Sequence, residues 1–163
     1  MKVIFLDIDG VLNSTAFLTR QHEAGIELPW PECHLDTAAV SVLNEIVAMT
    51  GAVVVVSSTW RIGVSIVWLQ ETLNKAGFKG LVLDKTVRLN KVARGLEIQE
   101  WLDTHKLAPG ETMSYVILDD DTDMEHLYPK LVHIDDHEGL TDKYLPQIFE
   151  HLWLKDSYEN PER

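Results

Sequence analysis

The stretch Met1–Asn13, MKVIFLDIDGVLN, decides the fold, because an apolar run typical of a buried strand ends in two nearby carboxylates. Alternate side chains of a strand share a face, so we expect Asp7 and Asp9 side by side where the strand opens into a loop. Gly10 then allows a sharp turn and the close approach of a ligand. Two adjacent carboxylates repel each other unless a cation joins them or one holds a proton. This layout is typical of a metal-assisted phosphoryl-transfer site.

Short apolar runs recur along the chain and alternate with segments of helical spacing, which indicates an α/β domain with a mainly parallel sheet. The continuous apolar character of these runs predicts strands that are covered on both faces. We expect five strands, near residues 3–6, 52–56, 81–83, 115–118 and 131–134. Helices are expected between Asp36 and Gly51, from 66 to 76, from 96 to 105, and from 145 to 153 with Pro146 in its first turn.

Two segments do not show a regular pattern. Residues 14–35 contain Gly25, Pro29 and Pro31 and are expected to be irregular, forming either a lid over a substrate or an inert surface excursion. The polar residues 154–163 are expected to be a C-terminal tail that frays, after a single domain at residues 1–153.

Composition limits the class of protein. Acidic residues outnumber basic ones 26 to 14 and give a formal charge of −12, which counts against tight binding to nucleic acid or to an anionic membrane. Cys33 is the only cysteine, so no disulfide forms within the chain. Without an apolar run long enough for a membrane helix or a signal peptide, we expect a soluble cytoplasmic protein. The oligomeric state stays open.

Polar residues follow two further strands, where ligands of parallel sheets bind. Ser57 and Ser58 follow the second strand and offer hydroxyl groups to a phosphate, although they also suit helix capping. Four aspartates follow the fourth strand, and their mutual repulsion favours a bound hard cation. These four are Asp119, Asp120, Asp121 and Asp123.

Trp60 and Arg61 come directly after the serines and have two interpretations. The pair could stack on a base and grip a phosphate. Alternatively, Trp60 packs on the sheet and Arg61 points into solvent.

The motifs together resemble a known family. The segment DIDGV matches the DxDx[TV] signature of haloacid dehalogenase (HAD) superfamily phosphatases, and the later motifs follow in that family's order. Ser57 resembles the motif II hydroxyl, and the run LDDDTD at 118–123 resembles the acidic motif IV. Arg94 is similar in placement to the motif III cation, with Lys91 as the competing candidate. The spacing is similar to that of small phage and bacterial HAD proteins, which include the HAD domains of RNA-repair proteins.

The resemblance implies a Rossmann-like α/β/α sandwich with a five-stranded sheet and little or no cap, because few residues separate the motifs. It implies that Asp7 is the nucleophile and that Asp9 is the general acid and base. A magnesium ion would be held by Asp7, by the backbone carbonyl of Asp9 and by Asp120. Asp119 and Asp123 would act indirectly or through water, although the register of the aspartate run leaves the direct ligand open.

The remaining site residues are expected to contact the substrate. Ser57 and Arg94 would stabilise the phosphoryl group during transfer. The candidate substrate-binding residues are Gly10, Ser58, Arg61 and Lys91.

The sequence therefore predicts a Mg²⁺-dependent phosphohydrolase that acts through an aspartyl-phosphate on a phosphate monoester. The substrate is expected to be a phosphorylated small molecule, a nucleotide above all, or a nucleic-acid end. One alternative is a binding or regulatory module of the same fold that holds metal or phosphate without turnover. Another is a phosphatase for a phosphoprotein or a small metabolite.

Overall fold

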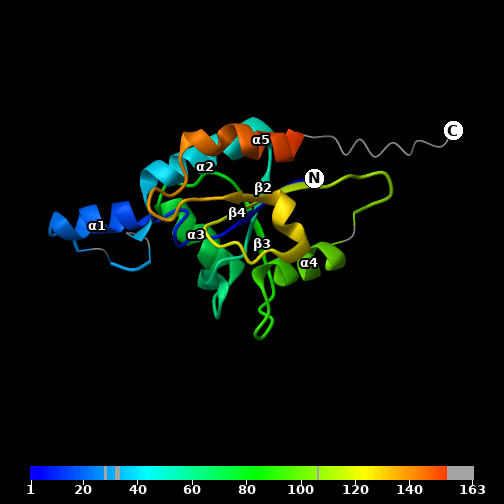
Figure 1. Ribbon diagram of the computed structural model, residues 1–163, viewed down its shortest axis with the longest axis horizontal. Coiled ribbons are helices and arrows are strands. Elements are labelled where there is room, and N and C mark those ends of the chain that lie inside the picture. Colours follow the sequence, from blue (N-terminus) through cyan, green and yellow to red (C-terminus); the bar gives the residue numbers. More distant parts are fainter. Residues whose placement is uncertain (28, 32–33, 106, 154–163) are drawn as a thin grey trace.

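The computed structural model describes residues 1–27, 29–31, 34–105 and 107–153. Its centre is a five-stranded parallel sheet with the strand order β3-β2-β1-β4-β5 (Figure 1). The first strand is therefore the middle strand, flanked by β2 and β4. The strands are β1 (Lys2–Leu6), β2 (Val53–Val56), β3 (Val82–Lys85), β4 (Ser114–Asp119) and β5 (Leu131–His133). All five expected strands are confirmed, with bounds that differ by one or two residues.

Helices cover both faces of the sheet and complete a Rossmann-like α/β/α sandwich. Figure 1 shows α2 and α5 together along one side of the sheet and α4 on the opposite side. The α-helices are α1 (Thr15–Glu23), α2 (Thr37–Thr50), α3 (Ile66–Lys75), α4 (Arg94–Thr104) and α5 (Leu145–Trp153). The described residues also include the short 3₁₀ helices η2 (Thr59–Arg61), η3 (Glu125–Lys130) and η4 (Asp142–Tyr144).

Strand β1 shows why the apolar runs lack alternation. Ile4 and Leu6 pack into a core with residues of α2, α3 and α5, whereas Val3 and Phe5 pack into a second core with α4 and η3. All four side chains are completely buried. A strand that is covered on both faces needs apolar residues at every position, and this confirms the expectation from the sequence.

The ends of α2 follow the capping residues in the sequence. The Asp36 carboxylate accepts a hydrogen bond from the backbone N–H of Ala38 at 2.9 Å, which satisfies one of the unpaired donors in the first turn. Gly51 ends the helix with a left-handed φ of 69°, a conformation that glycine adopts without strain.

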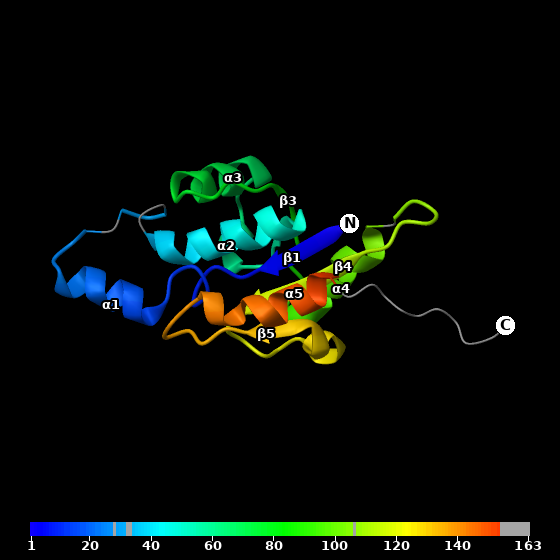
Figure 2. The same cartoon turned by 90° about the horizontal axis from the view of Figure 1, so that it is seen from above.

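The expectation that residues 14–35 are irregular is wrong for the first part of this segment. Ser14 caps α1 by accepting a hydrogen bond from Phe17 N at 3.1 Å, and α1 lies beyond the carboxyl ends of the strands (Figure 2). The backbone N–H groups of Thr15 and Ala16 donate to Asp136 and His137, so a distant loop holds the first turn. Apolar periodicity could not reveal this helix, because Phe17 is its only buried residue.

The proposed single domain at 1–153 and the tail at 154–163 stay predictions, because the tail lies outside the described residues. None of the helices described here combines the length and the apolar character that crossing a membrane requires.

Candidate active site

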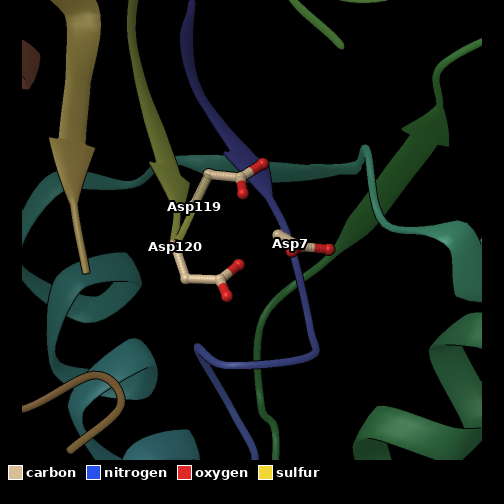
Figure 3. Close-up of side chains that lie close together, drawn as sticks. All are labelled: Asp7, Asp119 and Asp120. Carbon is tan, nitrogen blue, oxygen red and sulfur yellow. The ribbon is translucent and has the colours of Figure 1, made fainter. Parts of the chain in front are cut away.

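Three carboxylates meet at the carboxyl end of the sheet, where the neighbouring strands β1 and β4 end. Asp7 follows β1, Asp119 is the last residue of β4, and Asp120 comes next in the chain. The backbone N–H of Asp7 donates to Leu118 O at 2.9 Å, which fixes the two strand ends relative to each other. One oxygen of each carboxylate lies within 4.8 Å of the others (Figure 3). Parallel pairing thus brings together residues that are far apart in the sequence.

Arg94, the first residue of α4, reaches this group. Its Nη1 lies 2.8 Å from Asp7 Oδ1 and 3.0 Å from Asp119 Oδ2, and its side chain is 17% exposed. Burial disfavours the charged guanidinium, but the two carboxylates outweigh burial and hold the pKa of Arg94 above its ordinary value. A permanent positive charge therefore lies beside Asp7.

One guanidinium does not balance three carboxylates. Burial, and then the charge of Asp7, raises the pKa of Asp119 to about 8 and that of Asp120 to about 6. Arg94 acts in the opposite direction on Asp119 without cancelling these effects. The group therefore has oxygen ligands and surplus negative charge, which are the properties of a site for Mg²⁺.

Gly10 makes room for one of these carboxylates. A Cβ atom at this position would lie 2.5 Å from Asp120 Oδ2, and the φ of Gly10 is +77°. We expected Gly10 to allow the close approach of a ligand, and the group that approaches it is the Asp120 side chain. Only glycine fits both constraints without displacing Asp120.

The two serines after β2 differ in their contacts. Ser58 Oγ accepts a hydrogen bond from Trp60 N at 3.3 Å and caps η2, which is the capping alternative considered for this residue. Ser57 is completely buried, and its Oγ has no hydrogen-bond partner among the described residues. A buried hydroxyl without a partner is costly, so the Ser57 hydroxyl, unlike that of Ser58, has hydrogen-bonding capacity that the described residues do not use.

Asp9 follows Asp7 closely in the chain, but it does not belong to the group of three carboxylates formed by Asp7, Asp119 and Asp120. Its carboxylate is exposed and accepts hydrogen bonds from Asn13 Nδ2 at 2.8 Å and from Trp60 Nε1 at 3.0 and 3.1 Å. The two aspartates of the DID segment therefore have different surroundings. Asp7 is in contact with a guanidinium, whereas Asp9 is held by neutral N–H donors.

The Arg61 side chain is buried, so the interpretation in which it points into solvent is wrong. Its three nitrogens donate five hydrogen bonds, four to backbone carbonyls and one to Glu97 Oε2 at 2.5 Å. A guanidinium has five N–H donors, so none is left for a phosphate. The expected substrate contact of Arg61 is therefore not supported.

Two further expectations change with the geometry. Asp123 does not belong to the group of three carboxylates. Its Oδ2 instead accepts a hydrogen bond from Arg94 N at 2.9 Å, which satisfies a backbone donor in the first turn of α4. Lys91 is exposed and sits in a turn with a φ of 57°. Of the two candidates for the motif III cation, Arg94 is the one that contacts Asp7.

A comparison with protein families agrees with this arrangement. The family described as "HAD domain in Swiss Army Knife RNA repair proteins" matches residues 3–145. The chain belongs to this family. Searches of curated proteins and of solved structures gave no match. Membership in the HAD family supports phosphohydrolase chemistry of the HAD type in general.

Sequence reasoning missed two partners in this HAD domain. Glu97 neutralises Arg61 although the two residues are 36 positions apart, and Trp60 holds Asp9 from 51 positions away. Neither contact has a local signal, because no spacing rule links residues from different elements. The position of Trp60 in the sequence, three residues after Ser57, was the available indication that Trp60 lies near the site.

Proposed function

We propose that this HAD domain is a Mg²⁺-dependent phosphohydrolase that cleaves a phosphate monoester, with Asp7 as the nucleophile. The observation that supports this proposal is the group of Asp7, Asp119 and Asp120 with Arg94 in contact. Its surplus of negative charge and its oxygen donors fit a divalent cation, and Asp7, Asp119 and Asp120 would hold it. Of the two residues after β4, Asp120 is the better candidate for a direct ligand, because Asp119 is completely buried and paired with Arg94 whereas Asp120 is partly exposed. When bound, the ion supplies positive charge that neutralises the phosphoryl oxygens.

The first half of the reaction transfers the phosphoryl group to the protein. A carboxylate oxygen of Asp7 attacks phosphorus, and the bond between phosphorus and the leaving oxygen breaks. Asp9, in its protonated form, gives its proton to that oxygen. Arg94 lies next to Asp7 and stabilises the negative charge that spreads over the phosphoryl oxygens.

The second half releases phosphate. Asp9, now a carboxylate, takes a proton from a water molecule that attacks phosphorus, and the bond between phosphorus and Asp7 breaks. Asp9 is suited to both halves because it is exposed and lies outside the group of three carboxylates. The Ser57 hydroxyl, which has no partner among the described residues, is available to donate to a phosphoryl oxygen.

The proposed substrates are a nucleotide or the phosphorylated end of a nucleic acid, because the matched family occurs in RNA-repair proteins. The net charge of −12 counts against long contacts with a polymer, so we favour recognition of the terminal group. A cytoplasmic location is part of the proposal, and the single cysteine at position 33 is consistent with it.

Phosphate release tests this function. Wild type and Asp7→Asn are compared on nucleoside monophosphates, on oligonucleotides with a 3′- or 5′-phosphate and on an aryl phosphate, with and without Mg²⁺. We expect Mg²⁺-dependent turnover that falls by about 10³-fold or more in Asp7→Asn, because a nucleophile has no substitute. Asp121→Asn is the control, since Asp121 is an exposed member of the same acidic run outside the group.

Two results would contradict the proposal. Equal turnover by wild type and Asp7→Asn would remove Asp7 from the nucleophile role. No turnover of any substrate by a folded protein that binds Mg²⁺ would instead favour a binding module. Mass spectrometry of acid-quenched protein adds a direct check, because the phosphoryl adduct is expected on the peptide that carries Asp7.

A further inference from the structure

Three tryptophans form a continuous aromatic surface next to Asp9. The rings of Trp30 and Trp60 have centroids 5.5 Å apart, and those of Trp30 and Trp68 are 5.7 Å apart. Trp60 belongs to η2, Trp68 to α3, and Trp30 to the segment between α1 and α2. Trp30 is 60% exposed, although it is a large apolar side chain held against two other rings.

This surface is continuous with the proposed catalytic site. The indole N–H of Trp60 donates to both carboxylate oxygens of Asp9, at 3.0 and 3.1 Å. In the proposed function, on which this step rests, Asp9 gives its proton to the leaving oxygen. The remainder of the leaving group must then lie near Trp60, and Trp30 is the next exposed ring along the surface.

The charge and shape of this region indicate what kind of leaving group fits. The chain carries a net charge of −12 and the site itself is rich in carboxylates, so backbone phosphates held close to this surface would be repelled, whereas those farther along a strand lie in solvent. A neutral, flat ring meets no such repulsion and gains by stacking on an indole. We propose that Trp30 and Trp60 form a stacking surface for the nucleobase of the substrate, which would be a nucleotide or a nucleic-acid end with an intact terminal base.

Matched substrates with and without a base test this inference. One pair is adenosine 5′-monophosphate and ribose 5-phosphate, which share the phosphate, the leaving oxygen and the sugar. The other pair is a short oligonucleotide with a 3′-phosphate whose terminal nucleotide is intact or abasic. For wild type, kcat/KM is expected to be about 10- to 100-fold higher for the member with a base in at least one pair.

Variants at Trp30 test where the nucleobase binds. Trp30 is chosen rather than Trp60, because the Trp60 indole donates to Asp9 and its removal would also disturb the proposed general acid and base. Trp30→Ala is expected to reduce the base preference about tenfold, mainly through KM, whereas Trp30→Phe retains most of it because a phenyl ring also stacks. Trp153→Ala is the control. Trp153 is also an exposed tryptophan stacked on another ring, Phe149, but it lies on α5.

Equilibrium binding decides the inference separately from turnover. Calorimetric titration of Asp7→Asn with adenosine 5′-monophosphate and with ribose 5-phosphate should show tighter binding of the nucleotide, and Trp30→Ala in the same background should remove the difference. Equal affinity for both probes would overturn the stacking surface while leaving an Asp7-dependent phosphatase intact. Self-association of the protein that Trp30→Ala abolishes, without any base preference, would also overturn it and would identify a protein interface.

Discussion

Two arginines near the carboxyl end of the sheet differ in how well their charges are balanced. Arg61 pairs with one carboxylate, Glu97, and donates its other hydrogen bonds to backbone carbonyls. Arg94 contacts both Asp7 and Asp119, with Asp120 in the same group. The pKa of Arg61 is lowered by burial despite Glu97, whereas that of Arg94 is raised because its carboxylates outweigh burial.

This difference in charge balance distinguishes the structural ion pair of Arg61 and Glu97 from the candidate active site around Arg94. The Arg61 pair is closed, because every donor of the guanidinium is used and its charge is neutralised. The group around Arg94 has more negative charge than it can balance, so a cation lowers its energy. Burial of a charged residue near the strand ends is therefore a poor indicator of function, and the local charge balance is a better one. Four predictions test this comparison.

Breaking the closed pair should have the largest effect. Glu97→Ala leaves Arg61 buried without its counter-ion and is expected to lower the free energy of unfolding by about 3–5 kcal/mol. Urea denaturation measures this loss. Glu100→Ala, at an exposed position on the same helix, is the control and should change stability by no more than about 0.5 kcal/mol. A loss below 1 kcal/mol for Glu97→Ala would show that the pair is not structural.

Removing the positive charge of Arg94 from its group of carboxylates should affect activity. Arg94→Ala is expected to lower kcat/KM with Mg²⁺ present by about 10²–10³-fold, because the charge beside Asp7 is lost. Lys91→Ala should change kcat/KM little, since Lys91 is exposed and Arg94 occupies the position beside Asp7. Steady-state kinetics of both variants therefore decides between the two candidates for the motif III cation. A larger effect of Lys91→Ala would reverse our assignment.

Gly10→Ala should disturb the carboxylates around Arg94 without removing a charge. The added Cβ would meet the Asp120 carboxylate at 2.5 Å, so Mg²⁺ affinity is expected to fall about 10- to 100-fold in calorimetric titration. Gly51→Ala is a matched control, because Gly51 also has a positive φ, of 69°, but has open space around its Cβ position. If both variants lost the same affinity, backbone strain rather than contact with Asp120 would be the cause.

The smallest expected effect is a pH dependence. Asp119 and Asp120 have pKa values raised from 3.8 to about 8 and about 6, so the folded chain holds these protons more tightly than the unfolded chain. Their stabilising contribution is present below pH 4 and is lost as the pH rises towards 8 in metal-free protein.

Mg²⁺ must displace these protons, so the increase in melting temperature on adding Mg²⁺ should be larger at pH 8 than at pH 6. Thermal denaturation with and without Mg²⁺ at both pH values measures the difference. Asp119→Asn should reduce the pH dependence of the metal-free protein. A larger increase at pH 6 would contradict surplus negative charge in this group.

Much of the fold could be predicted because its signals are local. Strands covered on both faces require apolar runs, and α2 begins and ends at Asp36 and Gly51 as the sequence indicates. The first helix, α1, was missed because its first turn is held by backbone groups of a loop more than a hundred residues later. Its capping residue Ser14 was a local signal for the start of this helix.

The candidate site was predictable in part for the same reason. The DID segment and the aspartate run were recognisable because each follows a strand, and parallel pairing brings strand ends to one edge. Their catalytic roles stay predictions. The surroundings of Arg61 and Asp9 could not be predicted, since their partners Glu97 and Trp60 belong to other elements.

The sequence by itself determined the strands, most of the helices and the presence of acidic residues at two strand ends, because apolar periodicity and capping act over a few residues. Only the tertiary structure decided which arginine is neutralised within the scaffold and which meets the carboxylates. It also placed Trp60 next to Asp9 and Trp30 against Trp60. The physical reason is that charge balance and ring contacts depend on distances between elements, which the packing of helices on the sheet sets.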